Sequence, residues 1–168
     1  MAREEKQHKI EVHVAGLCFR ETQCSIEILI VKRQMQRKLY PGLWECGGGQ
    51  VKSGENFLKA IKRQIQEELG IIVDEAWPFG TYEIKTRELK QKKIPGVKFV
   101  CLWNNYVNRK EPQIDKKEHS QWKWQSIDNL SEIDFIPGIK KDIRQGWEFY
   151  VNNKNMLISK RFKILSIE

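Results

Sequence analysis

Two adjacent glutamates, Glu67 and Glu68, stand near the end of a segment, residues 49–71, that opens with glycine. On a helix, Glu68 lies near the border of an apolar face and Glu67 about a quarter-turn further round. Adjacent carboxylates repel each other, and partial burial raises their cost unless a cation compensates. Hard divalent ions such as Mg²⁺ favour oxygen ligands of this kind, together with water and phosphate oxygens. The pair therefore indicates metal-assisted phosphate chemistry, unless both glutamates are simply solvated helix formers.

The residues around this pair have the pattern of an amphipathic helix over residues 55–69. Ser53 or Gly54 can start it, and Glu55 suits its positive N-terminal end. Gly70 follows the last apolar residue, as is typical of a helix stop. Apolar residues at helical spacing predict a face directed to a core, and they are Leu58, Ile61, Ile65 and Leu69.

The segment resembles the Nudix box, G-x5-E-x7-R-E-U-x-E-E-x-G-U, in which U is an aliphatic residue. With every spacing intact, the matching residues are Gly49, Glu55, Arg63, Ile65, Glu67, Glu68, Gly70 and Ile71. Gln64 departs from the pattern, because the box has a glutamate at that position. An amide accepts a hydrogen bond or weakly ligates a metal, but it cannot act as a base. The resemblance implies that Glu67 and Glu68 bind metal and that Arg63 pairs with Glu55 in a structural role.

The departure at Gln64 bears on the general base. Some Nudix enzymes use the box glutamate to ligate metal or to activate water, whereas others place the base on a later loop. Glu118, in KKEHSQWKW, resembles such a late glutamate. The resemblance implies that Glu118 ligates the metal and accepts the proton from the attacking water. It is equally well read as an ordinary loop glutamate among lysines. His119 is a second candidate acceptor, because its intrinsic pKa is near neutrality.

Three consecutive glycines lead into the box. The segment YPGLWECGGGQV resembles the family segment in which a tryptophan precedes a Pro-Gly-Gly turn, with Gly47 at the proline position. Glycines let the backbone approach a ligand closely. The resemblance implies that the Gly48 carbonyl joins the metal shell. Cations at and after the end of the strand predicted at residues 25–33 are candidates to bind those substrate phosphates that the metal does not hold. Alternatively, they are only solvated residues at a strand end. They are Arg33, Arg37 and Lys38.

Composition favours a compact protein with an anionic ligand. The chain of 168 residues suffices for one core, so we expect a single domain over residues 1–168, and the net charge of +8 suits anionic substrates. The polar start MAREEKQH and the lack of an apolar run of about 18 residues predict neither secretion nor membrane insertion, so we expect a cytoplasmic protein. Buried thiols rather than disulfides or zinc ligands are expected at Cys18, Cys24, Cys46 and Cys101.

The order of segments predicts an α/β fold, and the resemblance implies a Nudix-like α/β/α sandwich with a mixed sheet. Strand patterns occupy residues 9–20, 25–33, 42–51, 77–87, 97–107 and 122–127. The box helix is expected at 55–69, a short helical turn at 128–133, and a C-terminal helix from Pro137 to about residue 152. The resemblance covers about residues 8–153. The C-terminal extension 154–168 alternates enough to predict an extra strand, and its apolar residues suggest a homodimer interface.

The resemblance implies Mg²⁺-dependent hydrolysis, with Mn²⁺ as the alternative metal, of a diphosphate linkage in a nucleoside triphosphate or another nucleoside diphosphate derivative. The segment DFIPGIK, which contains Phe135, resembles the region that closes the base pocket in family members. Most aromatics in a domain of this size belong to the core, so at most one or two are expected to contact a base. The candidates are Tyr40, Trp44, Phe79, Tyr82, Trp103 and Phe135.

Three alternatives stay open. A basic run is compatible with an RNA 5′-end pyrophosphohydrolase, although such runs are usually solvated surface segments. Its residues are Lys85, Arg87, Lys90, Lys92 and Lys93. Gln64 permits a Nudix domain that binds nucleotide without hydrolysing it. The segment PGLWE also resembles isopentenyl diphosphate isomerase, which needs a catalytic cysteine that Cys46 or Cys101 would have to supply.

Overall fold

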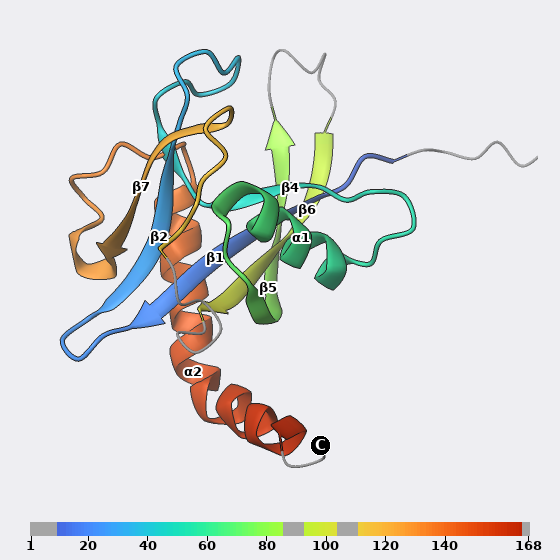
Figure 1. Ribbon diagram of the computed structural model, residues 1–168, viewed down its shortest axis with the longest axis vertical. Helices are drawn as coiled ribbons and strands as arrows, with labels where there is room; N and C mark the ends of the chain where they lie inside the picture. Colours follow the sequence, from blue (N-terminus) through green and yellow to red (C-terminus); the bar gives the residue numbers. More distant parts are fainter. Residues whose placement is uncertain (1–9, 86–92, 104–110, 166–168) are drawn as a thin grey trace, which may run out of the picture.

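The protein is described here from a computed structural model that covers residues 10–85, 93–103 and 111–165. Its strands are β1 (His13–Glu21), β2 (Ile26–Arg33), β3 (Trp44–Glu45), β4 (Gly47–Gln50), β5 (Val73–Lys85), β6 (Lys93–Trp103) and β7 (His119–Ser126). Its helices are α1 (Phe57–Leu69), the 3₁₀ turn η2 (Ile127–Asn129) and α2 (Ile139–Leu165). The predicted elements are present with shifted bounds, except for the strand predicted over residues 42–51 and the C-terminal extension (Figure 1). Residues 86–87 and 104–107 of two predicted strands lie outside the described residues.

The strands form one mixed sheet in the order β3-β2-β1-β6-β5, with β4 also paired to β1 and β7 paired to β2. β1 and β6 run parallel. The pairs β1–β2, β1–β4, β2–β3, β2–β7 and β5–β6 are antiparallel. The predicted mixed sheet is confirmed.

The prediction of one strand over residues 42–51 is wrong, because the chain changes partner at Cys46. Before this residue, β3 pairs with the end of β2, where Glu45 is opposite Val31. After it, β4 pairs with the start of β1, where Gly47 is opposite Gly16. The break places the glycine run against the middle of the sheet, next to α1.

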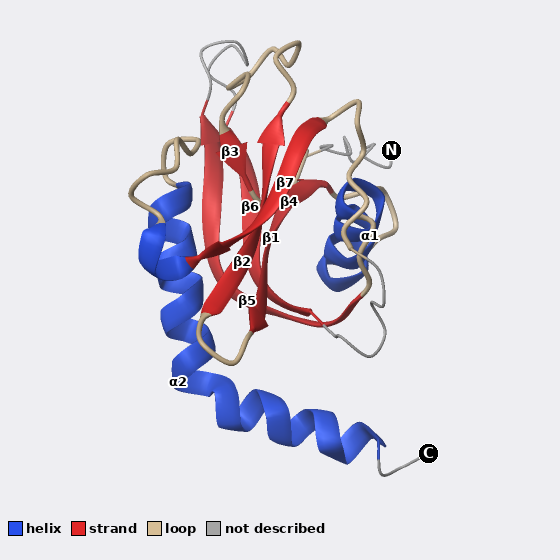
Figure 2. Cartoon of the chain, turned by 60° about the vertical axis from the view of Figure 1, so that its left-hand side comes forward, coloured by secondary structure: helices blue, strands red, loops and turns tan. Residues whose placement is uncertain are grey.

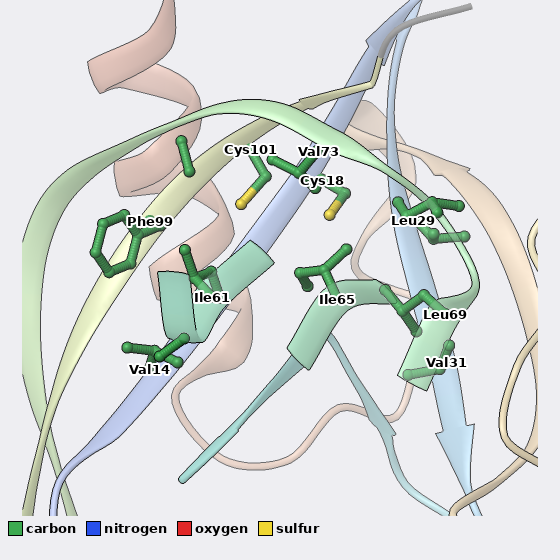
Figure 3. Packing of buried hydrophobic residues seen from close by; sticks show 13 residues of the cluster. Val14, Cys18, Leu29, Val31, Ile61, Ile65, Leu69, Val73, Phe99 and Cys101 are labelled. Carbon is green, nitrogen blue, oxygen red and sulfur yellow. The ribbon is translucent and has the colours of Figure 1, made fainter. Parts of the chain in front are cut away.

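Helices cover both faces of the sheet, so the predicted α/β/α sandwich is confirmed (Figure 2). One apolar cluster lies between the sheet and α1 and includes Val14, Leu29, Val31, Ile61, Ile65 and Leu69 (Figure 3). A second lies on the α2 side and includes Leu17, Phe19, Ile28, Ile30, Val100 and Ile143. Alternate residues of β1 and β2 supply the two clusters, because successive side chains of a strand point to opposite faces.

Helix α1 begins two residues later than predicted. Asn56 is its N-cap, and the Asn56 side chain accepts a hydrogen bond from the Lys59 N–H at 2.8 Å. Gly70 ends it in the left-handed conformation, as predicted, with φ 66°. The predicted apolar face is wrong at Leu58, which is 44% exposed, because the buried face starts only at Ala60 and Ile61, after the first turn.

The predicted extra strand at the C-terminus is wrong, because α2 continues to Leu165 and extends beyond the sheet (Figures 1 and 2). No proline or glycine stops the helix after residue 152. Side-chain contacts also favour the longer helix: Lys154 pairs with Glu21 of β1 at 2.5 Å, and Asn153 bonds to the Phe149 carbonyl at 2.8 Å.

The cysteines agree with the sequence prediction except at one position. Cys18, Cys46 and Cys101 are buried, whereas Cys24 is exposed in the turn between β1 and β2, and all four are free thiols. Within the described residues, no helix is long and apolar enough to cross a membrane.

Candidate active site

Glu68 lies at the meeting point of α1 and the glycine run. Its neighbours in the helix, Ile65 and Leu69, are buried against the sheet and fix the helix face. The Gly48 N–H donates a hydrogen bond to Glu68 Oε2 at 3.0 Å. Gly48 has φ 157°, and a Cβ there would overlap the Val14 carbonyl oxygen and lie 2.8 Å from the Ala15 Cα. Only glycine therefore lets β4 approach β1 closely enough to present this N–H.

The environment of Glu68 is unfavourable to its charge. Its pKa is raised to about 8, first because burial penalises the charged form and then because the charges of Glu45 and Glu118 lie nearby. The hydrogen bond from Gly48 and the charge of Arg37 oppose this rise. The charges of two carboxylates from distant parts of the chain thus act on Glu68 at the end of α1.

Glu118 is held between α1 and the loop that follows β2. The Asp115 N–H bonds to the Glu68 carbonyl at 2.9 Å, which attaches the segment before β7 to the helix. On the other side, the Gln34 N–H bonds to the Glu118 carbonyl at 3.0 Å. Arg37 Nη1 lies 2.7 Å from the Glu118 carboxylate. The predicted late glutamate is therefore in the neighbourhood of Glu68, with its charge paired to Arg37.

Glu45 is the site residue that sequence reasoning missed. Its carboxylate accepts a hydrogen bond from Arg33 Nη1 at 2.6 Å and lies 3.2 Å from His119 Nε2. Arg33 also donates from Nε to the Leu39 carbonyl at 2.9 Å, which closes the loop after β2. The available signal was the position of Glu45 in WECGGG, one residue before the glycine run.

His119 is almost fully buried, with 2% of its surface exposed. Its Nε2 faces Glu45, and its Nδ1 is buried without a hydrogen-bond partner among the described residues. His119 is therefore a buried histidine rather than a solvated loop residue. Because its Nε2 already faces the Glu45 carboxylate, the contacts favour Glu118 over His119 as the candidate proton acceptor.

Glu67 points into a different network from Glu68. Its carboxylate pairs with Arg63 Nη1 at 2.8 Å and with Lys52 Nζ at 3.5 Å, and its side chain is 52% exposed. Arg63 also binds Glu55 through Nε at 2.7 Å and Nη2 at 2.8 Å, which is the predicted structural pair. Hydrogen bonds from Arg63 and from the Lys52 N–H lower the pKa of Glu55 to about 2.

Gln64, which replaces the glutamate of the box, binds the backbone of β4. Its Nε2 donates to the Gln50 carbonyl at 3.1 Å. A Cβ on Gly49 would lie 2.7 Å from the Gln64 Cδ, so the glycine makes room for this amide. Gly49 therefore lets α1 pack closely on β4.

Of the predicted substrate-binding residues, Arg33 and Phe135 are already engaged by the protein itself. Phe135 is 7% exposed and packs in the cluster on the α2 side, where it bridges to Trp44 of β3. Arg37 is the more exposed cation, with 37% of its side chain accessible. The basic run from Lys85 to Lys93 falls mostly on residues 86–92, outside the described residues.

The donor set around Glu68 suits a hard divalent cation by its chemistry. The charges of two further carboxylates act on this buried carboxylate, and carboxylate oxygens are the donors that such ions prefer. Among residues 10–85, 93–103 and 111–165, no three acidic, histidine or cysteine side chains are gathered as one coordination group. The structure shows the N–H of Gly48, rather than its carbonyl, directed to Glu68.

Comparison with known proteins agrees with this arrangement. The model of the NUDIX domain family matches residues 9–145. The nucleoside triphosphatase NudI of Escherichia coli O139:H28 is 27% identical over 120 residues, which are 69% of this chain and 84% of that protein. A MutT NUDIX hydrolase from Burkholderia pseudomallei has a similar fold, with TM-score 0.66, 21% identity and coverage of 82% of this chain and 98% of that chain. The NUDIX domain of Shewanella oneidensis NrtR complexed with ADP ribose has TM-score 0.69, 17% identity and coverage of 88% and 92%.

The family match spans most of the chain, and it includes the glycine run, α1, and both Glu45 and Glu118. The chain therefore belongs to the NUDIX domain family, and its predicted class, a Nudix-type pyrophosphohydrolase, is confirmed.

Proposed function

We propose that this protein hydrolyses the diphosphate linkage of a nucleoside triphosphate, or of a related nucleoside diphosphate derivative, with Mg²⁺ as its metal. The observation that carries the proposal is the buried Glu68, held by the Gly48 N–H beside Glu45 and Glu118. Burial of a carboxylate among like charges is costly unless a cation compensates. The similarity to a nucleoside triphosphatase supports the substrate class.

Glu68 and Glu118 are the residues that we expect to hold the metal, with Glu67 and the Gly48 carbonyl as further ligands. When bound, Mg²⁺ would neutralise phosphate charge and lower the pKa of a bound water. Glu118 is the proposed proton acceptor, because Gln64 cannot serve as a base. Arg37, which lies beside Glu118, is placed to steady a phosphate group.

The remaining residues organise this centre. Arg33 and Glu45 hold the loop after β2 against the glycine run. Arg63 and Glu55 fix the loop before α1. These pairs are structural, and we expect their loss to lower stability before it changes the chemistry.

The test is release of phosphate or pyrophosphate from canonical and oxidised nucleoside triphosphates, nucleotide sugars, dinucleotides and 5′-triphosphate RNA, with Mg²⁺, with Mn²⁺ and with EDTA. Glu68→Gln should lose about a hundredfold or more in turnover. Glu148→Gln is the matched control, because it makes the same exchange on a helix at an exposed side chain of α2 that the proposal does not use. Equal turnover in the wild type and in Glu68→Gln would overturn the proposal.

A binding domain without hydrolysis is the second candidate, favoured by Gln64 and by the fold shared with the NrtR domain, which was solved with ADP ribose. It predicts nucleotide binding without product release across the whole panel. The isomerase alternative requires a reactive thiol, but Cys101 is fully buried and burial raises the pKa of Cys46 well above its usual value. Turnover that survives replacement of both by alanine would dismiss it.

RNA as a substrate, a homodimer and a cytoplasmic location stay predictions. The RNA hypothesis predicts a steep fall of 5′-triphosphate RNA binding with salt concentration. A shallow slope would count against it. Equilibrium sedimentation of the full chain would decide the oligomeric state.

A further inference from the structure

Strand β7 has a bulge at its start. Lys32 of β2 is opposite Gln121, whereas the next residue of β2, Arg33, is opposite His119, so Ser120 is the extra residue. Without the bulge, Ser120 would be opposite Arg33, and His119 would point to the other face of the sheet, because the side chains of a strand alternate. The bulge therefore directs His119 to the same face as Arg33.

His119 meets Glu45 and Arg33 on this face, which is the one that α1 covers. Val31, two residues before Arg33, belongs to the apolar cluster beneath α1, and Glu45 is opposite Val31. One oxygen of Glu45, Oε1, lies 2.6 Å from Arg33 Nη1 and 3.2 Å from His119 Nε2. Because a carboxylate paired with arginine only accepts hydrogen bonds, His119 donates from Nε2. We call this set the Arg33–Glu45–His119 triad.

The Arg33–Glu45–His119 triad places three polar side chains in the interior. The side chains of Arg33 and Glu45 are 13% and 17% exposed, and that of His119 is 3% exposed. The buried Nδ1 of His119 has no hydrogen-bond partner among the described residues, which costs free energy. Apolar side chains of similar size often stabilise a fold at least as well as buried charges. What they lack is direction, because a hydrogen bond holds its donor at a defined distance and angle.

The ring of His119 anchors the segment that carries Glu118. His119 is the one buried side chain among residues 115–120. The N–H groups of Glu118 and His119 both donate to the Asp115 carbonyl, at 3.0 and 2.9 Å, and the Gln34 N–H donates to the Glu118 carbonyl at 3.0 Å. The Asp115 N–H in turn donates to the carbonyl of Glu68 itself, at 2.9 Å. A shift of the ring would therefore move Glu118 relative to the end of α1.

We propose that His119 is a positioning residue, whose hydrogen bond to Glu45 sets where the Glu118 carboxylate stands relative to Glu68. The inference rests on the proposed function for the role of Glu118. In this role, His119 acts through Glu118 and contacts neither the metal nor the substrate. Displacement of a reacting group by about 1 Å can lower a rate about a hundredfold. Loss of the hydrogen bond should therefore appear in turnover more than in substrate affinity.

Two substitutions separate the hydrogen bond from the packing of the ring. His119→Gln keeps an N–H donor near the place of Nε2, whereas His119→Leu fills the space without a donor. In His119→Leu, kcat should fall about tenfold to a hundredfold with KM changed less than about twofold, and His119→Gln should restore most of kcat. Ser120→Ala is the matched control, because it changes the adjoining exposed residue and should keep wild-type kcat. If His119 only supports the fold, both substitutions will lower activity and melting temperature together, without rescue by glutamine.

Amide hydrogen exchange of the full chain tests the positioning without any hydrolysis. The amides of Gln34 and Glu118 should exchange at least about tenfold faster in His119→Leu than in the wild type and in His119→Gln, while the amide of Ile65 in α1 keeps its rate. Equal exchange in the wild type and His119→Leu would overturn the inference, and so would faster exchange with an unchanged kcat. A wild type that turns over no substrate would refute the proposed function alone, because the exchange rates still decide whether His119 holds Glu118 in place.

Discussion

Replacement of Gly48 by alanine is the sharpest test of how the site is built. A Cβ at this position would overlap the Val14 carbonyl oxygen and lie 2.8 Å from the Ala15 Cα. Both obstacles are backbone atoms of β1, so no side-chain rotation can relieve them. Overpacking of this kind costs about 1–3 kcal/mol, and a φ of 157°, which favours glycine, adds about 1–3 kcal/mol. We expect Gly48→Ala to lose about 2–6 kcal/mol of unfolding free energy.

Gly54→Ala is the matched control. Gly54 also has a positive φ, 81°, but a Cβ there would meet nothing within 4 Å. The control therefore carries the conformational cost of about 1–2 kcal/mol without the collision with β1. Thermal unfolding followed by circular dichroism should show a fall of roughly 4–24 °C for Gly48→Ala and a clearly smaller one for Gly54→Ala. Equal melting temperatures for the two variants would refute the reasoning.

Three further predictions test the surroundings of the site. Hydrogen bonds to Glu55 lower its pKa from 4.5 to about 2, so its contribution to stability is present above pH 4.5 and is lost as the pH falls towards 2. Urea unfolding at several acid pH values should therefore show a smaller loss of stability in Glu55→Gln than in the wild type, and parallel losses would contradict the pairing. Ile65→Ala should cost about 2–5 kcal/mol in urea unfolding because Ile65 is fully buried, whereas Leu58→Ala, at a side chain 44% exposed, should cost less than about 1 kcal/mol. Tyr150→Phe removes a 2.6 Å hydrogen bond to Glu21 and should lower the melting temperature by about 2–4 °C, for a loss of about 1 kcal/mol, and an unchanged value would show that this bond does not fasten α2.

The amino-acid sequence by itself determined the local features of this protein. The spacing of Ile61, Ile65 and Leu69 predicted the buried face of α1, because side chains on a helix repeat with a period that a sequence shows directly. Gly70 marked the end of the helix for a similarly local reason, since glycine adopts the left-handed conformation without strain. The spacing of Arg63 and Glu55 in the box predicted the ion pair that these two residues form.

Tertiary structure alone decided which carboxylates act on Glu68. Glu45, Glu68 and Glu118 come from β3, α1 and the segment before β7, and their proximity depends on sheet register and on the break at Cys46. Local periodicity carries no information on such register. Glu67, next to Glu68 in sequence, turns to Arg63 and Lys52 instead, because successive helix residues point about 100° apart. The residue types were therefore set by the sequence, whereas the fold decided which carboxylates share one site.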